Sequence, residues 1–336
     1  MSTHKQKPVL IVGGSGVVGS LAAKELRRLQ PTLPITIGGR DLARAEAVAR
    51  ELGHADATRV DLTRADLGQP AERAYSAVVM FLKDDSLNSL RYAQAQGVPY
   101  QGISTALFEV APEVALHMAR PGRSAILMNG TWLVGSAIAA VLHFAREFKT
   151  LDSIAIGGVL DEQDVGGPAA YADLDRMTKS AANALLLENG QWRWVDSTEG
   201  MRKFRDSTGL EVQGQAYSLL DPSALAAATG AKSVRTDVFI GTSASRRRGE
   251  PYSTEIIIEL EGTRPDGTPA RTRHELIHPA GQAPVTAVGV AVGVERLLGL
   301  AGGAPVEPGL YLPTVLIEPE YHLRRLQESG LQVRGA

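Results

Sequence analysis

The chain has 336 residues, of which 44% are hydrophobic and 21% charged, and its formal net charge is −2. This composition is ordinary for a globular protein of about two domains, and the small net charge argues against a nucleic-acid or membrane-surface partner. The sequence has no cysteine, which excludes disulfides, thiolate catalysis and cysteine-ligated zinc. It shows neither a secretion signal nor an apolar run of about 18 residues, so we expect a cytoplasmic protein with no membrane contact.

The first expected strand, residues 9–12, ends in a glycine-rich turn that leads directly into a helix. The turn has the pattern GxGxxG in the strand–turn–helix setting of a dinucleotide site. Such glycines allow a tight turn, close approach of the backbone to a pyrophosphate, and close packing of the helix. The alternative is a glycine turn with a purely structural role. We expect the cofactor to contact Gly13, Gly14, Ser15, Gly16, Val17 and Gly19.

The second expected strand, residues 34–38, is followed by Gly39, Arg40 and Asp41. Sites for NAD usually carry an acid about 20 residues beyond the glycines, where it binds the ribose 2′-hydroxyl. Here Gly39 takes that place and Arg40 follows it, which favours the 2′-phosphate of NADP because a guanidinium matches phosphate oxygens. Asp41 is either a displaced ribose acid or, as the helical pattern after it favours, the N-cap of the next helix.

Four more strands are expected at residues 57–62, 76–82, 99–104 and 124–128, with helices between them. This alternation predicts an α/β fold with a Rossmann-type, doubly wound parallel sheet. Ligands of such sheets bind outside the carboxyl ends of the strands. The remaining expected cofactor contacts follow from that position alone and are Asp61, Phe81, Leu82, Ser104 and Asn129. Asp61 is equally well explained as a loop acid or cap.

The second half begins with a long apolar segment, residues 131–148, that predicts a helix. A strand at 153–160 and a helix at 169–187 follow, and then several strand-like stretches. Pro265, Asp266 and Gly267 predict the turn of a hairpin. This half is therefore expected to be an α+β domain built on a mostly antiparallel sheet.

Two motifs in this half are interpreted without a functional role. Arg246, Arg247 and Arg248 precede a glycine between two strands and are expected at a solvated hairpin tip. His274 and His278 belong to an HExxH pattern, but zinc sites of this type need a helix, and the context here is a strand before Pro279. We therefore expect no metal site.

The expected domains are a NADP-binding Rossmann domain at residues 1–131, a substrate and dimerisation domain at 132–283, and a terminal segment at 284–336 that packs back on the first domain. A homodimer could form through the exposed edge of the second sheet.

The chain resembles the saccharopine dehydrogenase-like family, and in particular its NADP-dependent reductases. The resemblance rests on VLIVGGSGVVG at residues 9–19, on GGRDLARAEAVA at 38–49, on the change of pattern at 129–132, and on the closing order of an apolar helix, Pro308-Gly309-Leu310-Tyr311 and a terminal helix. It implies a Rossmann domain with an inserted substrate domain, and hydride transfer at a C=N or C–N centre of an amino-acid-like substrate. Some relatives instead reduce C=C bonds in lipids.

Two departures from the family pattern bear on the substrate. Members that act on amino acids commonly have a Pro-Gly pair where Asn129-Gly130-Thr131-Trp132 stands here. No set of arginines for several substrate carboxylates is evident in the sequence. Saccharopine, a multiply charged molecule, is therefore not the expected substrate.

The favoured function is an NADPH-dependent reductase acting on the C=N bond of a small molecule. Three residues could donate the proton, namely Lys83 and Asp84 after the fourth strand and Tyr171 in the second domain. Lys83 could equally contact the cofactor ribose, Asp84 could cap a helix, and Tyr171 could serve only in packing. The alternatives are an enoyl reductase of the same family and a non-catalytic NADPH-binding protein.

Overall fold

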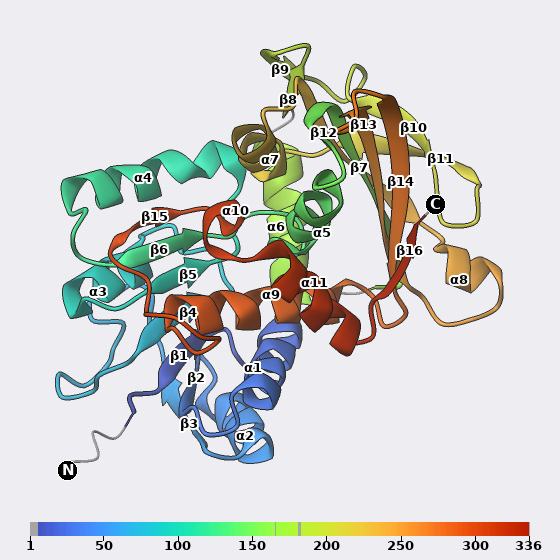
Figure 1. Ribbon diagram of the computed structural model, residues 1–336. Helices are drawn as coiled ribbons and strands as arrows, with labels where there is room; N and C mark the ends of the chain where they lie inside the picture. The colour runs from blue at the N-terminus through green and yellow to red at the C-terminus, as the bar shows by residue number, and fades with distance from the viewer. Residues whose placement is uncertain (1–5, 165, 181–182, 336) are drawn as a thin grey trace. The chain divides into compact units, whose positions relative to one another are not determined.

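The computed structural model describes residues 6–164, 166–180 and 183–335 (Figure 1). The chain divides into two compact units, which are described separately. The first unit comprises Met1–Thr105, Glu109–Gly130 and Ala287–Leu312. The second unit comprises Ala106–Phe108, Thr131–Thr286 and Pro313–Ala336.

The first unit contains one seven-stranded parallel sheet. Its strands are β1 (Val9–Val12), β2 (Ile35–Gly39), β3 (Ala55–Arg59), β4 (Ala77–Met80), β5 (Tyr100–Gly102), β6 (Ala125–Met128) and β15 (Gly309–Tyr311). Their order is β15-β6-β5-β4-β1-β2-β3, so the strand order reverses between β1 and β4. β1, β4 and β6 are buried along their whole length, as continuous apolar runs predict for a covered parallel sheet. The predicted doubly wound sheet is confirmed.

The helices that accompany this sheet are α1 (Val17–Leu29), α2 (Leu42–Leu52), α3 (Asn88–Gln96) and α4 (Val110–Ala119), with a short 3-10 helix η1 (Leu107–Glu109) before α4. α1 buries Gly19, Ala22, Ala23 and Leu26, a stripe of mostly small residues at helical spacing. The boundary between the units falls within α9 (Gln282–Leu297). Gly293 of α9 faces the side-chain amide of Gln101, and a Cβ there would lie 2.7 Å from it, so the glycine permits close packing on β5.

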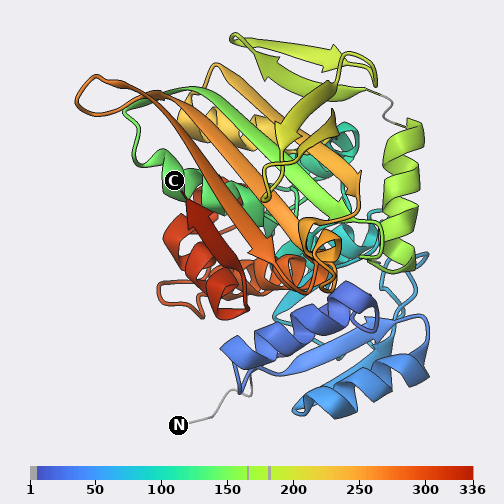
Figure 2. The ribbon, with the colours of Figure 1, turned by 90° about the vertical axis from the view of Figure 1, so that its right-hand side faces the viewer.

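The second unit is built on a mixed sheet in which all strand pairs except β7–β12 are antiparallel. Its strands are β7 (Thr150–Asp161), β8 (Ala184–Glu188), β9 (Gln191–Val195), β10 (Met201–Arg205), β11 (Glu211–Ala216), β12 (Ser233–Gly241), β13 (Thr254–Thr263), β14 (Pro269–His278) and β16 (Gln332–Gly335). The long strands β12, β7, β13 and β14 lie side by side (Figure 2). The predicted turn joins β13 to β14, with Gly267 at a φ of +87°.

The helices of the second unit are α5 (Ser136–Ala145), α6 (Pro168–Ser180), α7 (Asp221–Thr229), α8 (Ala244–Arg247), α10 (Pro313–Leu316) and α11 (Pro319–Glu328). α11 packs on α5, and β16 pairs with β14. The segment expected at 284–336 to pack as a whole on the first domain is therefore divided between the two units. Residues 287–312 group with the first unit because β15 pairs with β6, and the rest groups with the second unit.

Two helices are shorter than the sequence predicts. The helix expected at residues 131–148 is replaced by α5, because Leu133, Val134 and Gly135 all have positive φ angles of 49°, 57° and 81° and cannot continue a right-handed helix. The helix expected at 169–187 ends at Ser180, and its last residues form β8, which pairs with β9 and β12. Cross-strand pairing thus overrides the local helical pattern there. The strand β10 was not predicted.

Candidate cofactor site

The glycine turn after β1 is tied to its neighbours by backbone contacts. The N–H of Gly13 donates to the carbonyl of Gly38 at 2.8 Å, and the N–H of Gly16 donates to the carbonyl of Gly13 at 3.0 Å. Gly13 has a φ of +84°, and a Cβ there would lie 3.0 Å from the Cβ of Phe81. The turn therefore needs glycine at this position for both conformation and space.

Gly19 fixes how closely α1 approaches this turn. A Cβ at Gly19 would overlap the carbonyl oxygen of Gly13 and lie 2.9 Å from the Cα of Gly14. At the N-terminus of α1, the first hydrogen bond is donated by the N–H of Ser20 to the carbonyl of Gly16 at 3.0 Å. The N–H groups before it have no intrahelical acceptor, the first turn has no acid, and Val17 is 45% exposed. This end of α1 is therefore suited to a pyrophosphate.

The end of β2 carries a cation, and the acid nearest to it in sequence acts as a helix cap. A Cβ at Gly39 would lie 3.5 Å from the Oγ of Ser15, so the strand end adjoins the glycine turn. Arg40 is exposed, and its guanidinium makes no hydrogen bond or ion pair with any described residue. The Oδ1 of Asp41 accepts the N–H of Arg44 at 3.1 Å as the N-cap of α2. Asp41 thus occupies the cap position that its sequence context favours.

Asp61 lies two residues beyond β3, in an exposed loop. Its Oδ1 accepts hydrogen bonds from the N–H and the hydroxyl of Thr63, at 3.0 and 2.7 Å. These bonds lower the pKa of Asp61. The geometry is that of a loop acid that stabilises its own turn, one of the two roles the sequence left open.

The carboxyl ends of β4, β5 and β6 bring the other expected contacts to the same edge of the sheet. Phe81 and Leu82 lie against Gly13, and the Oγ of Ser104 donates to the carbonyl of Phe81 at 3.4 Å. The N–H of Asn129 donates to the carbonyl of Gly102 at 3.3 Å, and Asn129 is fully buried. These residues adjoin the point where the strand order reverses, which is where ligands of such sheets bind.

Lys83 lies beside acids that the sequence did not single out. Its Nζ is 3.3 Å from the Oε1 of Glu109, and both side chains are less than one-fifth exposed. One helical turn further, Glu113 is 4% exposed and accepts the hydroxyl of Thr105 at 2.5 Å. Burial raises the pKa of Glu113, although Thr105 and the charge of Lys83 oppose that rise. In the sequence, the four-residue spacing of Glu109 and Glu113 after the fifth strand is the feature that could have pointed to these two acids.

The other two expected proton donors have different surroundings. Both carboxylate oxygens of Asp84 accept hydrogen bonds, from the N–H and hydroxyl of Ser86 at 3.1 and 2.6 Å and from the N–H of Ser89 at 2.8 Å. This arrangement matches the alternative in which Asp84 caps a helix, here α3. Tyr171 lies in α6 of the second unit and is 53% exposed.

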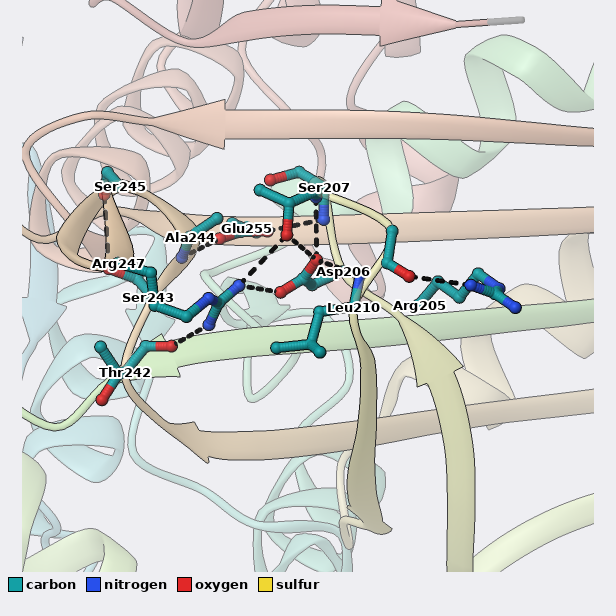
Figure 3. Close-up of polar contacts among 12 residues, drawn as sticks. Arg205, Asp206, Ser207, Leu210, Thr242, Ser243, Ala244, Ser245, Arg247 and Glu255 are labelled. Atoms are coloured by element: carbon teal, nitrogen blue, oxygen red, sulfur yellow. Dashed lines mark hydrogen bonds and ion pairs between the residues drawn. The ribbon is translucent and has the colours of Figure 1, made fainter.

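The three consecutive arginines do not form a solvated tip, and that prediction is wrong. Arg246 and Arg247 lie in α8 and reach buried carboxylates. Figure 3 shows Arg247 beside Asp206. Arg247 pairs with Asp206, and Arg246 lies 3.0 Å from Asp161, whose side chain is inaccessible. Arg248 pairs with the exposed Glu250, and Arg246 also pairs with the exposed Glu162. Buried acids on the sheet attract these cations from solvent.

The HExxH stretch lies in β14. The Nε2 of His274 is 3.1 Å from the hydroxyl of Thr272, and its ring stacks on Phe144 with centroids 3.7 Å apart. The Nε2 of His278 is 3.2 Å from the carbonyl of Ser329. Within the described residues, no group of three or more histidines and acids could hold a metal ion. None of the helices described is long and apolar enough to cross a membrane.

The sequence matches no protein-family model and no curated protein. Among solved structures, the chain is similar to an apo saccharopine dehydrogenase (L-Glu forming) from Saccharomyces cerevisiae, with a TM-score of 0.62 and 13% identity, over 98% of this chain and 100% of that one. It is also similar to a myo-inositol dehydrogenase from Corynebacterium glutamicum, with a TM-score of 0.47 and 11% identity over 97% and 95% of the two chains. It is similar as well to a dihydrodipicolinate reductase from Paenisporosarcina sp., with a TM-score of 0.45 and 10% identity over 93% of this chain and 100% of that one. The chain therefore shares the fold of a saccharopine dehydrogenase, as the sequence resemblance predicted.

Proposed function

We propose that this protein is an NADPH-dependent oxidoreductase that reduces a C=N bond in a small, amino-acid-like substrate. The observation that carries the choice of cofactor is Arg40, an exposed guanidinium with no partner among the described residues at the end of β2. The nearest acid in sequence, Asp41, is engaged as the cap of α2. A 2′-phosphate would pair with the positive charge of Arg40. A 2′-hydroxyl would instead need a carboxylate to accept its hydrogen bond, and the nearest one in sequence already serves as a helix cap.

Different residues of the first unit would bind different parts of the cofactor. The glycine turn and the first N–H groups of α1 would bind the pyrophosphate, and Arg40 would bind the 2′-phosphate. Phe81, Leu82, Ser104 and Asn129 would form the wall beyond the glycine turn. Bound NADPH would supply the hydride for the reduction.

Lys83 is the proton donor that the surroundings favour. Its Nζ lies 3.3 Å from the Oε1 of Glu109, which holds the side chain in place, and both side chains are less than one-fifth exposed. In the proposed step, the substrate carbon accepts the hydride, the π electrons of the C=N bond move to nitrogen, and the nitrogen takes a proton from the Nζ of Lys83. The amine that remains on Lys83 would then regain a proton from water.

The distribution of arginines in the second unit supports a substrate with few carboxylates. Arg202 and Arg235 both pair with the buried Asp237, while Arg246 and Arg247 pair with Asp161 and Asp206. These cations already neutralise buried acids, so withdrawing them for a ligand would leave carboxylates buried and unpaired. A multiply charged substrate such as saccharopine is therefore not proposed. A cytoplasmic location and a homodimer remain predictions from the sequence.

The test of the cofactor proposal is binding of NADPH and NADH to the wild type and to Arg40→Ala, followed by nucleotide fluorescence. Loss of a charged hydrogen bond of about 1.5–3 kcal/mol should weaken NADPH binding roughly 10- to 100-fold. NADH binding should change little. Arg50→Ala, which removes an exposed arginine from the far end of α2, is the matched control. Equal losses for both nucleotides would contradict the 2′-phosphate assignment.

The reaction is tested by NADPH oxidation with cyclic imines, with 2-oxo acids plus amines, and with enoyl compounds. Turnover of the imines alone supports the proposal, and turnover of the enoyl compounds alone indicates the C=C alternative. Tight NADPH binding without acceleration by any compound would favour a non-catalytic NADPH-binding protein.

A further inference from the structure

The second unit contains a cavity of about 290 Å³ that no step proposed above uses. It lies where the last turn of α6 meets the ends of β9 and β11, and its lining includes Met177, Val195, Asp196, Tyr217 and Ser218. Small-molecule sites usually begin at about 300 Å³, so this volume suits a ligand of only a few non-hydrogen atoms.

One wall of the cavity is an apolar cluster with fixed packing. Ala184, Val195 and Ala216 line the cavity and, together with Leu186, form a cluster whose members are at most 6% exposed. Met177 of α6 adds a flexible apolar side chain. This wall can bury a short aliphatic chain, and each methylene removed from water would strengthen binding.

Ser218, one of the lining residues, has a buried hydroxyl that lacks a partner among the described residues. The residue is 6% exposed. An unpaired buried hydroxyl is unfavourable, and a ligand with a polar hydrogen or lone pair would supply the missing hydrogen bond. The neighbouring Tyr217 is half-buried, and burial raises its pKa to about 12, so its hydroxyl stays neutral.

The charge of the lining is negative. The Oδ1 of Asp196 accepts the N–H groups of Thr198 and Glu199 at 2.8 and 2.9 Å, which hold the carboxylate in place and lower its pKa. No lysine, arginine or histidine is among the described lining residues. The cations on adjoining elements are already paired, Arg176 with Asp173 at 2.6 Å and Arg193 with Glu188. The Asp196 carboxylate would thus repel an anionic ligand and attract a cationic one.

We propose that this cavity binds a primary ammonium group carried on a short aliphatic chain. Asp196 would hold the ammonium, the cluster around Val195 and Ala216 would bury the chain, and Ser218 would accept or donate a hydrogen bond. The site lies wholly within the second unit and does not depend on the proposed cofactor or reaction.

The experiment uses the full chain labelled with ¹³C-methyl methionine, because Met177 lines the cavity and Met118, an exposed residue of the first unit, is a reference position elsewhere. n-Butylammonium, n-butanol and butyrate are titrated in turn without nucleotide. We expect a saturable shift of the Met177 methyl with butylammonium, at least fivefold weaker binding of butanol, and no saturable shift with butyrate.

Two variants separate a site from nonspecific contact. Asp196→Asn keeps the acceptor for the two N–H groups but removes the charge, and it should weaken butylammonium binding at least fivefold. Asp175→Asn, which removes an exposed carboxylate of α6 paired with Lys179, should leave binding within a factor of two. The proposal is overturned if Met177 does not respond up to roughly 20 mM butylammonium, if butyrate or butanol binds equally well, or if the two variants behave alike.

Discussion

Two turns that follow parallel strands of this chain are built in opposite ways. The turn after β1 uses glycines where the backbone is left-handed or crowded, as Gly13 and Gly19 show. The turn after β6 places the non-glycine residues Leu133 and Val134 at positive φ, which costs about 1–2 kcal/mol per residue. The first turn can be recognised from its own residues, whereas the second is held by residues far along the chain.

The support of the second turn comes from α7 and β7. The Oδ2 of Asp221, which is inaccessible to solvent, accepts the N–H of Trp132 at 2.8 Å. The Trp132 ring lies over Gly158, where a Cβ would overlap it. Strained backbone persists only where surrounding contacts determine it, and these two contacts do so here.

The largest effect is expected at the first turn, from Gly19→Val. The added side chain would overlap the Gly13 carbonyl and push α1 away, lowering the free energy of unfolding by about 3 kcal/mol. Urea unfolding and NADPH titration measure the change, and both the stability and the affinity for NADPH should decrease. Gly122→Val is the control, because no atom lies within 4 Å of a Cβ there. Equal effects of the two substitutions would refute the close-packing role.

The next effect is expected at the second turn, from Asp221→Ala. This substitution leaves the buried N–H of Trp132 without its acceptor and should lower the free energy of unfolding by about 1–3 kcal/mol. Asp221→Asn retains a carbonyl acceptor and should be much less harmful. If alanine and asparagine proved equally stable in urea unfolding, the hydrogen bond would not be what holds the turn.

The same aspartate gives the second turn a pH dependence that the first lacks. Burial raises the pKa of Asp221 from 3.8 to about 7, so the folded protein retains a proton that the unfolded chain releases. Stability from this group is complete below pH 3.8 and is lost as the pH rises through about 7. Asp221→Asn should therefore gain stability relative to the wild type as the pH rises from 3.8 to about 7, as measured by unfolding at each pH. A constant difference between the two proteins would contradict this linkage.

The smallest effect is expected from Asp41→Ala, beside the cofactor site. Loss of the N-cap of α2 should cost about 1 kcal/mol of stability and leave the ratio of NADPH to NADH affinity unchanged. Thermal unfolding and nucleotide titration separate the two effects. A selective loss of NADH binding would instead assign Asp41 to the ribose.

The sequence by itself determined the features that depend on neighbouring residues. The glycine pattern predicted the turn between β1 and α1, the buried apolar runs predicted the parallel sheet, and Pro265-Asp266-Gly267 predicted the β13–β14 hairpin, because each rests on local backbone conformation or burial. Gly39 and Arg40 likewise marked the end of β2 from spacing alone.

Only the tertiary structure decided the features that depend on distant partners. Asp221 holds the turn at Trp132, so the helix expected from residue 131 begins only at Ser136. Pairing with β9 and β12 converted the end of the helix expected at 169–187 into β8, and buried acids took Arg246 and Arg247 from solvent. The pairing of Lys83 with Glu109 also required the loops after β4 and β5 to meet. A buried charge or strained turn is stable only with its partner in place, and no local pattern specifies a partner that lies 26 to 89 residues away.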